Sequence, residues 1–134
     1  MKRLVLFMTI IAAAFALTGG TASATTGSET FHALTGPACS FAPESVGTAS
    51  WDTAPPATVK IRVRKLSPST EYQVQVVQGC LGSVNQQLGT LTTNKKGNAK
   101  GSYPFTSTTM GALHFRLFPT LVGTEYWTDV VDLS

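Results

Sequence analysis

The sequence is poor in the side chains that most often carry chemistry. Its 134 residues include two histidines and two cysteines, and only 13% of them are charged. A zinc or copper site needs several ligands at suitable spacing, and neither His32 nor His114 has a second ligand at helix or hairpin spacing. No Gly-x-Ser-x-Gly nucleophile elbow and no glycine-rich phosphate loop is present. We therefore predict no cofactor, no metal site, no catalytic residue and no enzyme activity.

The first 24 residues have the pattern of a signal peptide. Lys2 and Arg3 precede an apolar run over residues 4–17, and small residues follow at positions 22–24. The apolar run has fourteen residues, fewer than the roughly 20 needed to span a bilayer. We therefore expect cleavage after Ala24 and a secreted, extracellular chain without a stable membrane anchor.

Cleavage at that point changes the charge of the chain. The formal net charge of +3 includes Lys2 and Arg3, and without them eight basic residues face seven acidic ones, a net charge of +1. Such weak basicity does not favour nucleic-acid binding. The remaining 110 residues suit one domain. We expect a loop-rich segment over residues 25–45, with at most one strand near 30–34, and the domain itself over residues 46–134.

The strand pattern is clearest between residues 58 and 80. Apolar and polar residues alternate on both sides of a Pro68-containing turn, which predicts two neighbouring antiparallel strands. Other short strands are expected at 46–51, 87–93, 99–105, 113–117 and 125–133. Gly97 in the left-handed region would let residues 87–93 and 99–105 form a hairpin. The whole pattern predicts an all-β, two-sheet immunoglobulin-like sandwich of seven to eight short antiparallel strands.

The turn in this stretch carries a family resemblance. The segment Leu66-Ser67-Pro68-Ser69-Thr70-Glu71-Tyr72 resembles the L-x-P-x-T-x-Y signature of fibronectin type III domains. In that family a tyrosine hydroxyl bonds back to upstream backbone, so the resemblance implies a structural corner at Leu66, Pro68 and Tyr72. The strand order is also similar to that of the secreted enediyne-antibiotic apoproteins. Those carry two disulfides, whereas this chain has cysteines for one, so the likeness is architectural and implies no chromophore site.

The two cysteines allow one intramolecular pairing. Export places Cys39 and Cys80 in an oxidising compartment, so we predict a Cys39–Cys80 disulfide. Its expected role is to tie the N-terminal segment to the end of the strand that precedes Cys80. A reactive thiol or a metal ligand would need a low-pKa setting or histidine partners that the sequence does not show.

Two surface features are candidates for partner binding. Lys60, Arg62 and Arg64 share one face of a strand, with Lys65 at its end and Arg116 expected nearby, and such a stripe suits a cell-envelope polyanion or an acidic protein. An ordinary solvated strand face is the alternative that the low net charge favours.

Tyr126 and Trp127 are the second candidate, because adjacent strand residues point to opposite faces. One of them is expected to point outward for stacking or anchoring, unless it caps the sandwich end beneath the 119–124 loop. His114 is expected on the solvent side of its strand.

Three functions remain open at this point. The first is a secreted non-catalytic module that binds or associates through its surface in the cell envelope or medium. The second is a small-ligand carrier resembling the enediyne apoproteins. The third is a hydrolase whose site is assembled in space from one histidine and distant carboxylates, since such triads are recognised by geometry and not by sequence order.

Overall fold

A computed structural model describes residues 25–37, 39–80, 83–106 and 112–133, and the expected signal peptide lies outside these residues. All the regular structure in them is β-strand: β1 (Thr26–Gly36), β2 (Ser40–Asp52), β3 (Thr58–Val63), β4 (Glu71–Gln78), β5 (Ser83–Thr92), β6 (Ala99–Pro104), β7 (Ala112–Pro119), β8 (Tyr126–Thr128) and β9 (Val131–Asp132). No helix in the described portion of the chain is long and apolar enough to cross a membrane. The all-β prediction is confirmed.

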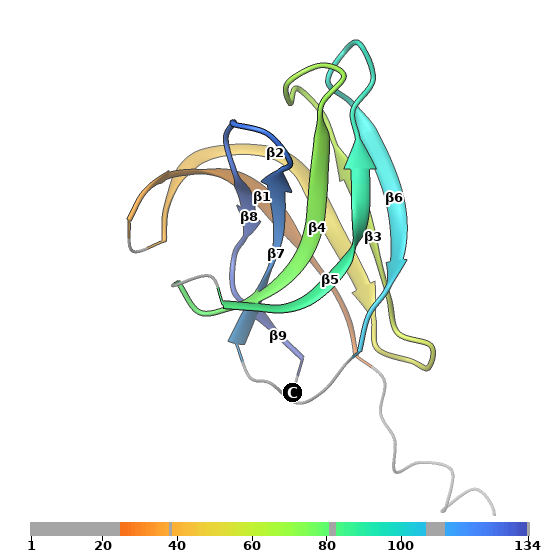
Figure 1. The fold of residues 1–134 in the computed structure, drawn as a ribbon. Helices are drawn as coiled ribbons and strands as arrows, with labels where there is room; N and C mark the ends of the chain where they lie inside the picture. Colours follow the sequence, from red (N-terminus) through yellow and green to blue (C-terminus); the bar gives the residue numbers. More distant parts are fainter. Residues whose placement is uncertain (1–24, 38, 81–82, 107–111, 134) are drawn as a thin grey trace, which may run out of the picture.

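The strands form one continuous antiparallel sheet that curls until its two ends meet (Figure 1). Their order is β5-β4-β7-β8-β1-β2-β3-β6, with β9 added beside β7. Within the ranges given above, no backbone ladder joins β5 to β6. Side chains close that gap: the Tyr103 hydroxyl donates to the Thr90 carbonyl at 2.8 Å, and the Gln86 amide exchanges two hydrogen bonds with the Thr106 backbone. The result is a nearly closed barrel instead of two separate sheets.

The interior of the barrel is filled by the inward residues of each strand, as period-2 alternation requires. In β3 the buried Val59, Ile61 and Val63 alternate with exposed residues. Aromatic rings from opposite walls meet in the middle, where Phe115 contacts Trp51 and Phe105 at centroid distances of 6.2 and 5.7 Å. Interior filling by large side chains is what a small barrel needs for a stable core.

The expected strand pairings around the two central turns are wrong. β3 pairs with β2 and β6, while β4 pairs with β5 and β7, so β3 and β4 are not neighbours. Residues 64–70 and 93–98 instead cross from one side of the barrel to the other and bond to each other. Thr93 is the centre of this contact: its hydroxyl donates to the Ser67 carbonyl and accepts from the Thr70 amide. Each crossing segment therefore satisfies the backbone of the other, which local periodicity does not reveal.

Gly97 is where these two segments come closest. Its φ of +81° lies in the left-handed region, as predicted, and its carbonyl accepts a hydrogen bond from the Leu66 amide at 3.0 Å. A Cβ at this position would collide with the Leu66 carbonyl oxygen. Glycine is thus required both by backbone conformation and by close approach.

Residues 25–45 are more ordered than expected. They form β1 and the first half of β2, which pair from Thr26↔Asp52 to Gly36↔Ser40 with register shifts after Phe31. The far half of this hairpin arches away from the barrel axis (Figure 1). We call residues 33–37 and 39–44 the hairpin strap. The polar and small residues that suggested a loop lie where the strap is bent and partly exposed.

Candidate functional site

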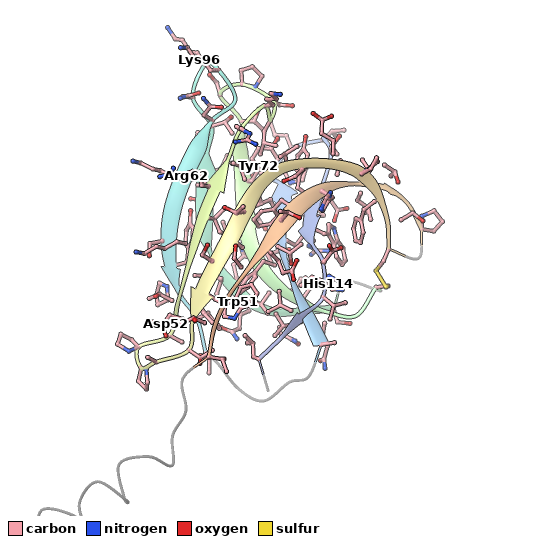
Figure 2. The ribbon with its side chains drawn as sticks, turned by 180° about the vertical axis from the view of Figure 1, so that it is seen from behind. Trp51, Asp52, Arg62, Tyr72, Lys96 and His114 are labelled. Carbon is pink, nitrogen blue, oxygen red and sulfur yellow. A yellow bond between two sulfur atoms is a disulfide. The ribbon has the colours of Figure 1, made fainter. Side chains whose placement is uncertain are left out.

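Seven of the eight basic residues that follow residue 24 lie on or beside β3 and β6. They are exposed, and we call them together the cationic face: Lys60, Arg62, Arg64, Lys65, Lys95, Lys96 and Lys100. The predicted stripe of Lys60, Arg62 and Arg64 is therefore the centre of a larger group. Figure 2 shows Arg62 pointing outward from β3 and Lys96 at the tip of the segment between β5 and β6.

Sheet register places these cations in rows. Arg62 is paired with Thr48 on β2 and with Lys100 on β6, so one row carries a hydroxyl and two positive charges. The next row is Ser50–Lys60–Ser102. Because Val59, Ile61 and Val63 point inward, the alternating residues of β3 must point outward. The same packing that builds the core thus fixes the direction of the charges.

Two shallow hollows lie over these rows. One, of about 540 Å³, lies between the β2–β3 surface and the segment that contains Asn94 and Asn98, and is lined by Arg62, Arg64 and Lys100. The other, of about 600 Å³, is lined by Lys60, Arg62 and Lys100 together with small residues. Both hollows share Thr48, Arg62 and Lys100. No acidic and no aromatic side chain lines either of them.

The cationic face has no internal counter-charge. Among residues 25–37, 39–80, 83–106 and 112–133, the one ion pair is Arg116 with Glu125, which lies elsewhere. Asp52, at the end of β2, is paired with Thr58 in the row next to that of Lys60, and its carboxylate accepts the Ala54 amide at 2.9 Å. The basic groups of the face are thus exposed to water and have no ion-pair partner among the residues that the structure describes.

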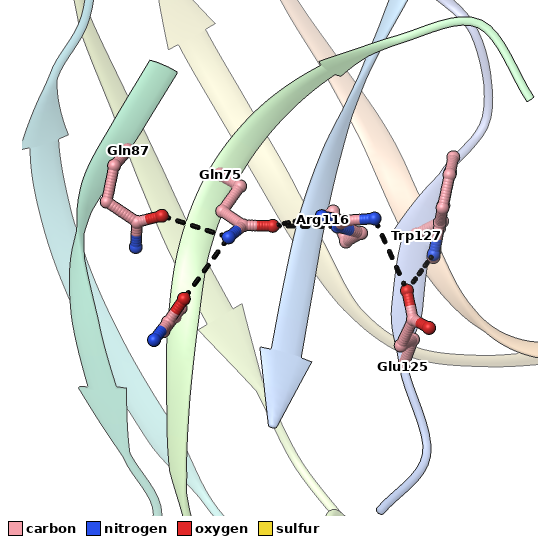
Figure 3. Close-up of polar contacts among 6 residues, drawn as sticks. Gln75, Gln87, Arg116, Glu125 and Trp127 are labelled. Atoms are coloured by element: carbon pink, nitrogen blue, oxygen red, sulfur yellow. Dashed lines mark hydrogen bonds and ion pairs between the residues drawn. The ribbon is translucent and has the colours of Figure 1, made fainter. Parts of the chain in front are cut away.

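Arg116 was expected near the stripe, but it lies on the outer face of the opposite wall. Its Nε donates to Gln75 Oε1 at 2.8 Å, and Nη2 donates to the same oxygen. Its Nη1 lies 3.6 Å from Glu125 Oε1 (Figure 3). The guanidinium also stacks over the rings of Phe118 and Trp127, at 4.9 and 5.4 Å from their centroids. Burial lowers the pKa of Arg116, and the nearby Glu125 carboxylate opposes that shift. Gln75, Glu125 and two aromatic rings thus hold the guanidinium, so the role of Arg116 is structural.

Neither Tyr126 nor Trp127 is exposed, so the proposed role of these residues as a surface anchor is wrong. They do point to opposite faces: Tyr126 enters the barrel core, and Trp127 lies outside it but keeps only 3% of its surface exposed. The hairpin strap covers Trp127, with Phe41 at 6.1 Å between ring centroids. A long-range contact of this kind leaves no mark on the local sequence around residue 127.

His114 is also covered, although it was expected to face solvent. Its exposed fraction is 3%, its Nδ1 lies 2.8 Å from the Thr128 carbonyl, and its ring packs against Trp127 and Phe41. The other histidine, His32, forms side-chain hydrogen bonds with the Thr30 hydroxyl and with the Ala42 carbonyl on the strap. Both histidines serve to fix the strap on the outside of the barrel.

The predicted Cys39–Cys80 disulfide is present. It joins the strap to the turn after β4, and therefore holds the strap over the outer face of β7 and β8. The bridge is a structural link between two segments of the chain that are 41 residues apart.

The expected tyrosine corner is not formed. Tyr72 is buried, but in the described residues its hydroxyl makes no hydrogen bond to the Leu66–Pro68 turn, and its ring packs edge-on against Tyr126 at 6.0 Å. Thr93 supplies the polar contacts of that turn instead. In this chain the L-x-P-x-T-x-Y pattern therefore marks the point where the chain enters the buried strand β4, and it does not indicate a tyrosine corner.

Lys100 and the pair Lys95–Lys96 were missed in the sequence. Lys100 alternates with the half-buried Ala99 and Gly101, so its outward direction was available from periodicity. What was not available is that β6 pairs with β3, which brings Lys100 next to Arg62.

The chain was compared with known proteins in three ways. No protein-family model, no curated protein and no solved structure matches it.

Proposed function

We propose that this protein is an exported, non-catalytic module that binds an anionic partner through the cationic face. The observation that carries the proposal is the segregation of charge: seven exposed cations gather around β3 and β6, with no carboxylate among the residues that line the two hollows. A solvated face that only protects a sheet edge would not need charges on β3, which is an interior strand of the sheet.

The small net charge does not weaken this proposal. Binding responds to the local electrostatic potential of a patch. The net charge of +1 after residue 24 does not reveal that seven of the eight basic residues lie together on the cationic face. Exposed charges attract a partner over about 10 Å at 0.1 M ionic strength, which is enough to steer a polymer onto the face.

Export is the second half of the proposal. The pattern of residues 1–24 and the Cys39–Cys80 disulfide support it, because disulfides persist in oxidising compartments. The partner would then be a component of the cell envelope or the medium.

The test is retention on an anionic polymer matrix, with salt elution. The variant R62Q/R64Q removes two charges from the face, and we expect it to elute at clearly lower salt than the unchanged protein. The matched control is V84E/V130E, which lowers the net charge by the same amount at two exposed positions on other strands or turns. Equal elution of both variants would show that only net charge matters, and the proposal would fail.

A further inference from the structure

The two hollows of the cationic face form one continuous track along β3. They share the Thr48–Arg62–Lys100 row and lie on either side of it. Lys60 and Arg62 lie on β3 and Arg64 directly follows its last residue, and the buried Ile61 and Val63 separate the three, so successive cations are two residues apart. Two residues of a strand span about 7 Å. A ligand that uses all three cations must therefore carry an anionic group about every 7 Å.

This spacing corresponds to a particular polymer chemistry. Six bonds of an extended polypeptide, which is two residues, cover about 7 Å. Six bonds also separate successive phosphorus atoms in a chain of three-carbon polyol units joined by phosphodiesters. An extended chain of this type therefore repeats its charge in step with every second residue of β3.

The rest of the track favours a polyol chain over a chain with rings. Thr48 is the strand neighbour of Arg62, and Ser50 and Ser102 are those of Lys60, so hydroxyl groups that can bond phosphate oxygens or polyol hydroxyls lie next to the cations. No aromatic side chain lines the track. Single-stranded nucleic acids have the same six-bond spacing, but their binding sites use aromatic platforms on which the bases stack. Sugar rings commonly need the same kind of platform.

We propose that the cationic face binds a linear three-carbon polyol phosphate polymer, laid along β3 with one phosphate at each of the three cations. This inference rests on the proposed function and specifies its partner. Arg62 and Lys100 together hold the central phosphate, and Lys60 and Arg64 hold the phosphates on either side.

The first experiment measures binding of glycerol phosphate oligomers with one to six phosphates, by titration calorimetry at 50 mM salt. We expect affinity to rise steeply up to three phosphates and slowly beyond. The variant R62Q/K100Q removes the central pair and should weaken binding roughly tenfold, about threefold for each exposed charge contact. The matched control K95Q/K96Q removes two charges outside both hollows and should weaken it less than threefold. Equal losses in the two variants would overturn the inference.

The second experiment compares polymers at equal charge concentration. We expect the glycerol phosphate polymer to bind more tightly than hyaluronan, whose carboxylates are one disaccharide apart, and at least as tightly as oligo(dT). Equal binding of hyaluronan would show that spacing is irrelevant and would overturn the inference while leaving the proposed function standing. Tighter binding of oligo(dT) would identify a nucleic acid as the partner and overturn it as well. Failure of every polymer to bind would overturn the proposed function itself.

Discussion

The molecule carries arginine in two contrasting settings. Arg62 stands in water on the outer surface of β3, with cations beside it and no carboxylate in reach. Arg116 stands on the outer surface of β7, yet it is 9% exposed and bonds Gln75, pairs with Glu125 and stacks on two rings. The two residues share a charge and a strand-face position. They differ in what lies around them.

This difference shows that the groups around a cation, and not its charge, decide whether the cation stabilises the fold. A buried ion that loses one partner leaves the other uncompensated, so the network around Arg116 is costly to break. Exposed charges contribute little to stability, because water and salt already screen them. The cationic face is thus free to change without unfolding the protein, which is the condition for a surface that binds something else.

The largest effect should come from removing the Cys39–Cys80 disulfide, which holds the hairpin strap over the side of the barrel that carries Arg116. We expect C39S/C80S to lower the free energy of unfolding by about 4 kcal/mol, the chain-entropy value for a loop of this length. Urea denaturation measures this loss, and a red shift of tryptophan fluorescence would report release of the strap from Trp127. Retention on the anionic matrix should not change. Loss of retention in a folded variant would show that the two regions are coupled.

Breaking the network itself should cost somewhat less. We expect R116M to lower the free energy of unfolding by about 3 kcal/mol, because Gln75 and Glu125 lose their buried donor. The control is R62M, which should stay within about 0.5 kcal/mol of the unchanged protein. Equal urea midpoints for R116M and R62M would show that the two arginines contribute equally to stability, which would contradict this prediction.

The cationic face should affect binding and leave stability unchanged. For R62Q/R64Q we expect unfolding within about 0.5 kcal/mol of the unchanged protein. The slope of log affinity against log salt for a phosphate polymer should become shallower by about 1.4, since each neutralised phosphate on a single strand contributes about 0.7. An unchanged slope, measured by salt-dependent titration, would mean that neither arginine contacts a phosphate.

The smallest effect is expected at Tyr72. In the described residues its hydroxyl has no hydrogen-bond partner, so Y72F should shift the free energy of unfolding by no more than about 0.5 kcal/mol. A loss of about 1 kcal/mol or more in urea denaturation would show that the hydroxyl is bonded in solution and would restore the corner.

The alternation of apolar and polar residues predicted well which face of the sheet each side chain occupies, but it predicted poorly which strands pair with each other. The alternation correctly placed Lys60 and Arg62 on the outside of β3, Val59 on the inside, and Arg64 outside just after the strand. It failed for β7, where His114 and Arg116 alternate correctly but are covered by residues far away in the sequence. Whether an outward residue is exposed depends on what packs over it.

The order of strands was harder to predict for the same reason. The turns after β3 and β5 have the composition of hairpin turns, and Gly97 has the predicted left-handed φ. Hydrogen bonds also join the two turns to each other, through the Thr93 hydroxyl and between Leu66 and Gly97, although Asn94 and Asn98 bond within their own turn. The disulfide was predictable because two cysteines allow one pair. The contact of Lys100 with the arginine stripe was not, because it depends on the pairing of β6 with β3.

The barrel should open first between β5 and β6, because no backbone ladder joins these two strands within the described residues. Elsewhere in the strand order neighbouring strands are joined by ladders of backbone hydrogen bonds, whereas here the contacts depend on the side chains of Tyr103 and Gln86. Amide protons along the facing edges should therefore exchange with solvent sooner than those in the middle of β3 or β7. Strand β6 is one edge of this gap and carries the exposed Lys100, so the cationic face extends up to the place where the barrel opens.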